Sequence, residues 1–200
     1  MIAIIRLKQI RPQDELFRAL VAGGITTVEV TLPTPGSTEA VERWRDEPGV
    51  LVGMGTIRTR DDVHRAVGAG ARFLVTPTTS ADVLAAANEE SVPVVCGALT
   101  PTEIDLAWRS GASRVKVFPV DAVGGLQYLR ALAGPLEDIP LVPTGGITPV
   151  EAEEYAAFGC VGVGVGSALV NEQVAIDREW EALHQRARHF VSRWSSGIAR

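Results

Sequence analysis

The feature that most constrains the fold is an alternation of short runs rich in β-branched residues with amphipathic helical stretches, repeated along the chain. The strand-like runs are IAIIRL (2–7), TVEVTL (27–32), VLVGMGT (50–56), RFLVTP (72–77), PVVCGAL (93–99), RVKVFPV (114–120), PLVPTGG (140–146) and VGVGVGS (161–167). Eight strand-helix units without a linker predict one domain over residues 1–200, an α/β fold of the single (β/α)₈ or TIM-barrel type. The alternative is an open doubly wound sheet, but LKQIRPQ after the first run lacks the G-x-G-x-x-G turn of that fold.

The helical segments between these runs carry their own start and stop signals. Segments such as DELFRALVAGG, DDVHRAVGAGA and PVEAEEYAAFG end in glycine, where a left-handed C-cap is expected. Small polar residues precede the periodic segments and are predicted to be N-caps: Ser37, Thr59, Ser80, Thr100 and Thr148. A last helix is predicted over residues 178–194, closing the chain.

Composition excludes several classes of function. With 46% hydrophobic and 22% charged residues the chain is typical of a globular protein, and its net charge of −5 gives no basic surface for nucleic acid or an anionic membrane. The apolar run at the N-terminus is broken by Arg6 and Lys8, and the longest uncharged stretch (155–171) is too short to span a membrane, so a cytoplasmic protein is expected. Cys96 and Cys160 are predicted to be core residues, and no CxxC or HExxH spacing indicates a metal.

The run RVKVFP places a lysine, Lys116, between two valines of a predicted buried strand. Because side chains alternate across a strand, Glu29 in TVEVT lies on the face opposite its neighbouring valines, and Lys116 does the same in its own strand. Valine faces of a barrel pack against the helices, so Glu29 and Lys116 are predicted to point into the barrel interior. Arg6 shares the parity of Ile2 and Ile4 and is expected to reach the same mouth.

A buried ammonium costs several kcal/mol unless it is paired or gives up its proton. One interpretation is a structural ion pair between Glu29 and Lys116. A buried pair, however, often stabilises a protein no better than apolar residues of equal volume, which favours a chemical role. A desolvated lysine near Arg6 would have a lowered pKa and could attack a carbonyl carbon as a free amine, while a neighbouring carboxylate moves protons.

Small and polar residues follow several predicted strands. TGGI (144–147) and GVGS (164–167) end the seventh and eighth runs, where this fold commonly binds phosphate through backbone N–H groups. The alternative for Gly162 and Gly164 is that they fill a narrow barrel interior. TPTT (76–79) and the Gly55-Thr56 pair are placed at the same rim, either to orient a carboxylate or hydroxyl of a ligand or as turn and cap residues.

These motifs together resemble a known family. VEVTL, GMGT, VKVFP, LRALAGP (129–135), PTGGITP (143–149) and GVGS are similar, in order and from Ile2 to about Val170, to the class I 2-keto-3-deoxy-6-phosphogluconate aldolases and their 6-phosphogalactonate relatives. The resemblance implies a lyase that splits a 2-keto-3-deoxy-6-phospho sugar acid into pyruvate and glyceraldehyde 3-phosphate without a metal or cofactor. It also implies a homotrimer.

The same resemblance implies a role for each matching residue. Lys116 would form the Schiff base, and Glu29 would transfer protons through water. The remaining site residues would be Arg6, Thr56, Pro77 and Thr144 for the substrate and Gly145, Gly146, Gly166 and Ser167 for its phosphate.

The chain departs from the phosphogluconate pattern at one position. Two residues after the threonine of VTL, where that type often has a carboxylate-binding arginine, it has Pro33; the phosphogalactonate type uses an arginine of the first strand, here Arg6. LVTP (74–77) and GCVGVGVGS (159–167) are also typical of the galactonate type, whereas Thr144 is typical of the gluconate type. The sequence therefore leaves the C4 epimer open.

Three other functions fit parts of the pattern. An aldolase for 4-hydroxy-2-oxoglutarate, or for another aldol derived from pyruvate, would use the same lysine and glutamate. A phosphate-binding barrel of the isomerase or synthase type shares the glycine-rich strand ends but forms no imine. A binding protein without turnover would use Lys116 only to anchor an anion.

Overall fold

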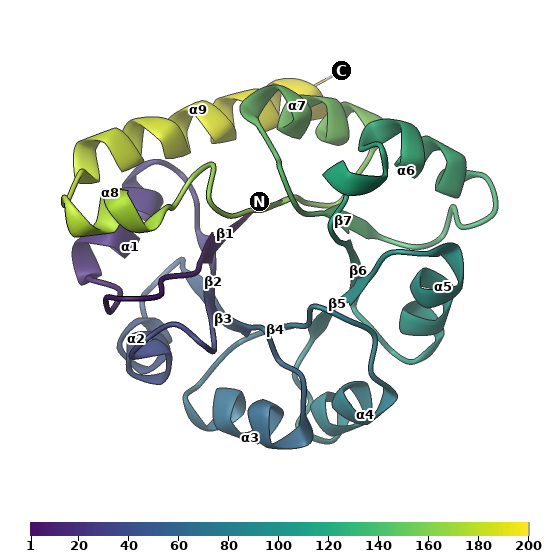
Figure 1. Cartoon of the computed structure of the whole chain (residues 1–200), viewed down its shortest axis with the longest axis horizontal. Coiled ribbons are helices and arrows are strands. Elements are labelled where there is room, and N and C mark those ends of the chain that lie inside the picture. The colour runs from purple at the N-terminus through teal and green to yellow at the C-terminus, as the bar shows by residue number, and fades with distance from the viewer. Residues whose placement is uncertain (200) are drawn as a thin grey trace.

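A computed structural model describes residues 1–199 and has the predicted (β/α)₈ barrel, with eight parallel strands inside a ring of helices (Figure 1). The strands are β1 (Ile2–Ile5), β2 (Thr27–Thr31), β3 (Leu51–Gly55), β4 (Leu74–Val75), β5 (Val94–Ala98), β6 (Arg114–Val117), β7 (Leu141–Pro143) and β8 (Gly164–Val165). The helices are α1 (Asp14–Ala22), α2 (Ser37–Trp44), α3 (Arg60–Gly68), α4 (Ala81–Glu89), α5 (Pro101–Arg109), the 3₁₀ turn η1 (Asp121–Val123), α6 (Leu126–Ala133), α7 (Pro149–Phe158), α8 (Glu172–Ile176) and α9 (Trp180–Ile198).

The strands pair in chain order from β1 to β7, and β8 returns to pair with β1. A bridge between Thr144 and Gly164 joins the two remaining edges and closes the ring. β4 and β8 have only two residues each and are shorter than the sequence predicts. The residues after β4 leave the ladder because the Thr76 hydroxyl donates to the Thr78 carbonyl at 2.8 Å and bends the chain into a rim loop.

Most predicted N-caps are confirmed. Thr59, Thr100 and Thr148 form capping boxes with acidic residues three positions later, and the Ser80 hydroxyl accepts from the backbone of Val83. Ser37 is wrong as a cap: it is the first residue of α2, its hydroxyl donates to the Leu32 carbonyl, and Gly36 holds the cap position with φ 68°. Asn171, which the sequence analysis missed, caps α8.

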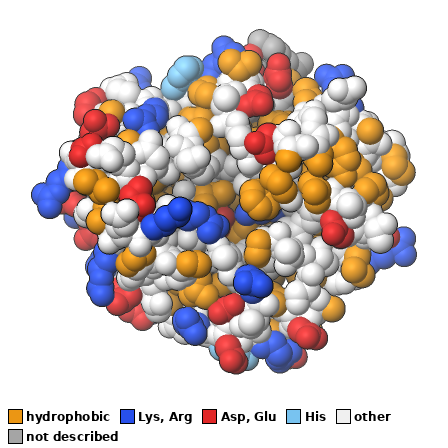
Figure 2. Space-filling model, viewed as in Figure 1, with side chains coloured by type: hydrophobic (Ala, Val, Ile, Leu, Met, Phe, Trp, Pro, Cys, Tyr) orange, Lys and Arg blue, Asp and Glu red, His pale blue; other side chains and the backbone are white. Residues whose placement is uncertain are grey.

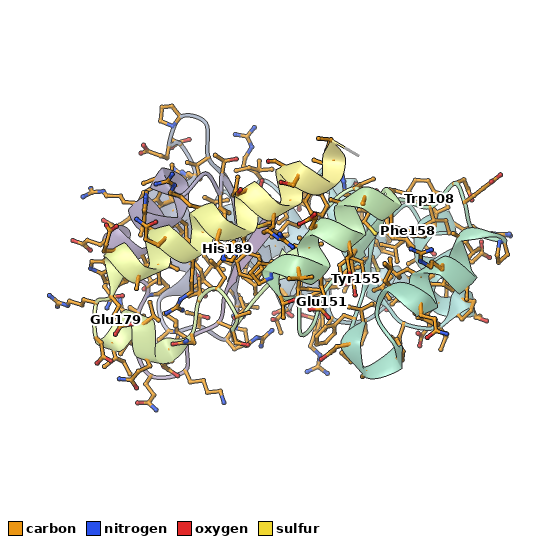
Figure 3. The ribbon with its side chains drawn as sticks, turned by 90° about the horizontal axis from the view of Figure 1, so that it is seen from above. Trp108, Glu151, Tyr155, Phe158, Glu179 and His189 are labelled. Atoms are coloured by element: carbon orange, nitrogen blue, oxygen red, sulfur yellow. The ribbon has the colours of Figure 1, made fainter. Side chains whose placement is uncertain are left out.

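Helix α9 closes the layer of helices. It crosses from α1 to α7 in Figure 1 and lies along α7 in Figure 3, where His189 marks α9 and Tyr155 marks α7. It begins later than the predicted residue 178, because Arg178 has a left-handed φ of 55°. It also runs on to Ile198, since Gly197 lets it approach α7 closely: a Cβ there would lie 2.3 Å from the Glu153 carbonyl oxygen.

An ion pair fixes the same helix contact. Arg193 of α9 lies 2.8 Å from the Glu153 carboxylate of α7, and the glutamate side chain is only 5% exposed. Across residues 1–199, no helix combines the length and the apolar character that crossing a membrane requires.

The predicted strand parity is confirmed. Val28, Val30, Val115 and Val117 pack with the helices in the large outer core, which the buried Cys96 and Cys160 also join. A separate, smaller cluster of Phe73, Val75, Val95 and Val142, with Ile2 against it, occupies the barrel interior. The interior-facing positions of β2 and β6 are therefore free for charged side chains above this apolar plug.

Glycines at interior positions make the barrel narrow enough to pack. At Gly97 of β5, a Cβ would lie 2.4 Å from the carbonyl carbon of Pro77 and 2.6 Å from the Thr76 carbonyl oxygen. At Gly164, a Cβ would lie 2.4 Å from the Thr144 hydroxyl, so this residue has the packing role that was the alternative to phosphate binding. At Gly162 the nearest such contact is 4.0 Å away.

We expect Gly97→Ala to lower the free energy of unfolding by about 1–3 kcal/mol, because the methyl group meets backbone atoms that cannot rotate away. The matched control is Gly68→Ala at the end of α3, where a Cβ meets nothing within 4 Å; it should be neutral or stabilise by about 0.5 kcal/mol. Urea unfolding of both variants measures the difference. Equal stabilities would contradict the close strand approach.

Candidate active site

Two charged side chains lie in the barrel interior, as the strand parity predicts. Lys116 of β6 is registered with Gly97 on one side and Val142 on the other, and it is 7% exposed. Glu29 of β2 is registered with Ile4 and Gly53 and is 2% exposed. Each charge therefore lies among small or apolar neighbours with little access to water.

Burial changes the protonation of both groups. Loss of water lowers the pKa of the Lys116 ammonium; Arg6 lowers it further, and the Glu29 carboxylate opposes the shift. Loss of water also raises the pKa of Glu29, and Lys116 and Arg6 oppose that shift. The lysine is thus poised to lose its proton and the glutamate to hold one, which is the pairing that amine nucleophiles and proton shuttles need.

Glu29 and Lys116 act on each other across the barrel, not in direct contact. None of the direct ion pairs within residues 1–199 joins them, so the interpretation as a simple structural ion pair is wrong. The Lys116 Nζ atom instead lies 5.0 Å from the centroid of the Phe118 ring. The two groups therefore influence each other through their charges, without a direct contact.

Gly55 makes the space that Glu29 occupies. A Cβ at this position would lie 1.7 Å from Glu29 Oε1, so the last residue of β3 can only be glycine while the carboxylate keeps its place. The requirement gives a physical reason for the GMGT sequence at this strand end.

Above these groups a cavity of about 700 Å³ opens at the carboxyl ends of the strands, and Figure 2 shows basic side chains at the edge of the central hollow. Lys116 and all eight of the predicted binding residues line it: Arg6, Thr56, Pro77, Thr144, Gly145, Gly146, Gly166 and Ser167. Glu29 is not among the lining residues and lies beneath them. The barrel thus brings together residues that are more than 150 positions apart in the chain.

Arg6 and Thr56 form one wall of the cavity. The Arg6 guanidinium donates to the Thr56 hydroxyl at 3.0 Å, which joins the end of β1 to the end of β3. Thr56 has a left-handed φ of 64°, a strained conformation for a β-branched residue that is typical of functional sites. The guanidinium keeps further N–H donors for a carboxylate.

In the rim segment TPTT, one residue fits the prediction of a ligand contact and two fit the prediction of turn residues. Pro77 lines the cavity. The hydroxyls of Thr76 and Thr79 donate to backbone carbonyls within the rim, at 2.8 Å to Thr78 and 2.9 Å to Gly97. The two threonines are therefore turn residues, and only the proline contacts the cavity.

The glycine-rich ends of β7 and β8 lie side by side, joined by the bridge between Thr144 and Gly164, and form another part of the cavity wall. Gly145 and Gly146 both have left-handed φ values, 108° and 63°, so their backbone turns sharply at the cavity surface. The exposed Asp121 carboxylate packs against this turn, since a Cβ at Gly146 would lie 2.6 Å from Asp121 Oδ2. Gly166 and Ser167 face the cavity from the next loop.

The cavity-lining residues that sequence reasoning missed include Lys8, Phe118 and Glu172. Phe118 follows Lys116 by two positions and shares its parity, a signal that would have found it. Lys8 and Glu172 are brought together only by the fold, because the Glu172 carboxylate accepts from the backbone N–H groups of Lys8 and Gln9 at 2.9 and 2.6 Å.

The sequence of this chain is similar to that of known aldolases. Residues 1–186 match the family model of KDPG and KHG aldolases. The chain is 32% identical over 194 residues to the KHG/KDPG aldolase of Escherichia coli K12, covering 95% of this chain and 90% of the relative.

Solved structures of this kind have the same fold. A native KDPGal structure superposes with a TM-score of 0.88 at 30% identity, over 100% of this chain and 96% of the other. KDPG aldolase from Legionella pneumophila, with pyruvate captured as a covalent carbinolamine intermediate, gives a TM-score of 0.83 at 30% identity, over 94% and 92% of the two chains. The chain belongs to the KDPG and KHG aldolase family.

Proposed function

We propose that this chain is a class I aldolase, independent of metal ions, that splits a 2-keto-3-deoxy-6-phospho sugar acid into pyruvate and glyceraldehyde 3-phosphate. The observation that carries the proposal is the buried amine of Lys116 on the wall of a cavity that also presents Arg6, with Glu29 in the barrel beneath. The Legionella relative with pyruvate held covalently as a carbinolamine supports this chemistry.

The first half of the reaction forms the imine. The unprotonated Lys116 amine attacks the C2 ketone of the substrate to give a carbinolamine. Glu29, acting through water, gives its proton to the carbinolamine hydroxyl, which leaves as water; a protonated imine and the Glu29 carboxylate remain. The lowered pKa of Lys116 raises the fraction of free amine that can attack at neutral pH. Arg6 holds the substrate carboxylate beside the reacting carbon, and Thr56 fixes the guanidinium.

The second half breaks the carbon–carbon bond. Glu29, acting through a water molecule, takes the proton of the C4 hydroxyl; the C3–C4 bond breaks and its electron pair neutralises the imine nitrogen. Glyceraldehyde 3-phosphate leaves, and an enamine of pyruvate remains on Lys116. Glu29 returns its proton to C3, and hydrolysis of the imine then releases pyruvate and the free amine. The raised pKa of Glu29 suits a carboxylate that must both accept and return a proton.

A second candidate substrate is 4-hydroxy-2-oxoglutarate, which the KHG part of the family name favours. Lys116 and Glu29 would act on it in the same way, because both substrates are 2-keto acids with a hydroxyl group at C4. The two substrates differ at the far end, where one carries a phosphate and the other a carboxylate. Selection between them therefore depends on the wall formed by the ends of β7 and β8.

We expect Lys116→Ala to lower turnover by at least about 10⁴-fold, because the variant lacks the amine that forms the imine. Treatment with pyruvate and borohydride should add one reduced pyruvate to Lys116 of the unaltered chain, as read by peptide mass, and none to the variant. Glu29→Gln should slow cleavage by about 10²–10⁴-fold yet still be trapped by pyruvate. Near-normal turnover of Lys116→Ala would disprove the imine mechanism.

The pH dependence of trapping tests the electrostatics. Imine formation needs free amine, so its rate rises with pH through the pKa of Lys116, which lies below the ordinary lysine value. Arg6→Gln removes a like charge and should raise this pKa, so the rise of the trapping rate moves to higher pH. Glu29→Gln removes the opposite charge and should lower the pKa of Lys116, so the rise of the trapping rate moves to lower pH.

Arg58→Gln is the matched control, since Arg58 is exposed and lies outside the cavity. The pH dependence of its trapping rate should coincide with that of the unaltered chain. Shifts of both site variants in the same direction would refute the assignment of these charges.

We also propose that the chain acts in the cytoplasm as a homotrimer. Exposed apolar side chains support an interface: Phe118 is 38%, Val123 36% and Val150 53% exposed, and Figure 2 shows hydrophobic side chains gathered on one side of the central hollow. Light scattering of the purified chain should give three times the 21.3 kDa of one subunit. The mass of a monomer would contradict the assembly.

A further inference from the structure

The cavity has a cation that the proposed chemistry does not use. Lys8 lies on the loop after β1 and lines the cavity, and no ion pair or hydrogen bond engages its ammonium within the described chain, residues 1–199. Arg6, two residues earlier, is engaged with Thr56 on the β3 side. The loop thus offers two positive charges to one cavity, and only the first has a partner.

The backbone of Lys8 is anchored toward the β8 side of β1, whereas the Arg6 side chain bonds toward β3. Its N–H and that of Gln9 both donate to Glu172 Oε1, at 2.9 and 2.6 Å. Glu172 is the first residue of α8, directly after the loop that contains Gly166 and Ser167. These bonds place Lys8 beside the β8 loop, at the end of the cavity proposed for the phosphate.

Within residues 1–199, Lys8 is the one basic side chain placed at this end of the cavity. The basic residues that line it are Arg6, Lys8 and Lys116; Arg6 contacts Thr56, and Lys116 lies at the reacting end. The acids near the β7 and β8 loops are Glu172 and Asp121, and the latter packs against the Gly145–Gly146 turn. A phosphate dianion held at this end by backbone N–H groups alone would lack a counter-charge, so a cation there strengthens its binding.

We propose that Lys8 is the specificity-determining cation for the phosphate of the substrate, and that Glu172 is a positioning residue that holds the Lys8 loop in place. The inference rests on the proposed function and names its substrate class: keto acids that carry a phosphate monoester at the end remote from the ketone. Lys8 contacts only this remote group, so it acts on the binding of phosphorylated substrates and not on imine formation.

The test compares two acceptor aldehydes in the addition to pyruvate, glyceraldehyde 3-phosphate and unphosphorylated glyceraldehyde. For Lys8→Met we expect KM for the phosphorylated aldehyde to rise about tenfold, as for loss of one partly solvated charged contact, with kcat changed less than about twofold. Kinetics with glyceraldehyde should stay within about twofold of the unaltered chain. Lys8→Arg should restore most of the affinity, because the charge is kept.

Two further variants sharpen the comparison. Glu172→Ala should reproduce the KM increase, because the two N–H groups that hold the Lys8 loop lose their acceptor. Arg11→Met is the matched control: it removes a positive charge from the same loop, but Arg11 pairs with Glu39 at 3.6 Å and lies outside the cavity. It should leave both aldehydes unaffected.

Added salt is an independent test of the contact between Lys8 and the phosphate, since screening weakens an exposed charge contact. The KM of the unaltered chain for the phosphorylated aldehyde should rise with ionic strength more steeply than that of Lys8→Met. An unchanged KM in Lys8→Met, or an equal loss for both aldehydes, would overturn the role of Lys8.

Trapping with pyruvate and borohydride separates this inference from the proposed function. If the unaltered chain is trapped on Lys116 but Lys8→Met shows no selectivity, only the role of Lys8 is wrong. If the unaltered chain cannot be trapped, the aldolase mechanism itself fails. Trapping of Lys8→Met at the normal rate is expected and also shows that the variant folds.

Discussion

The burial of a lysine inside the closed strand barrel is the constraint on which the rest of the structure depends. Lys116 keeps only 7% of its surface exposed, and water lost from its ammonium lowers its pKa. A fold that places a charge there must either neutralise it or use it. Here Glu29 lies in the same interior without a direct ion pair, so the field of the carboxylate reaches the amine, which itself lines the cavity.

The groups around the cavity are packed closely, and glycines in the strands make this possible. Gly55 leaves room for the Glu29 side chain, Gly97 allows the rim at Pro77 to approach β5, and Gly164 lets the Thr144 hydroxyl fit where the ring closes. Each glycine gives up side-chain packing in exchange for a close approach. The stability lost in this way is offset by the outer layer, where the valines of β2 and β6 and the contact of α7 with α9 bury a large apolar surface.

The cavity is polarised along its length. The reacting end has the buried amine and Arg6, which is hydrogen-bonded to Thr56. The remote end has the glycine turns and Lys8, whose ammonium has no ion pair or hydrogen bond within residues 1–199. A keto acid with a negative charge at each end complements this arrangement. The strained backbone of Thr56 lies where the arginine must be held still, which is where strain is useful to a catalytic site.

The sequence by itself determined the strand and helix alternation, the parity that sends Glu29 and Lys116 inward, and four of the five predicted helix caps, because these follow from local periodicity and side-chain chemistry. Its motifs also named Lys116 and eight other residues that line the cavity. Only the tertiary structure decided that Glu29 and Lys116 do not touch, that Gly36 and not Ser37 caps α2, and that Glu172 holds the loop of Lys8. The separation between Lys8 and Glu172 is 164 residues, and no local pattern records a contact that exists only because β8 returns to pair with β1.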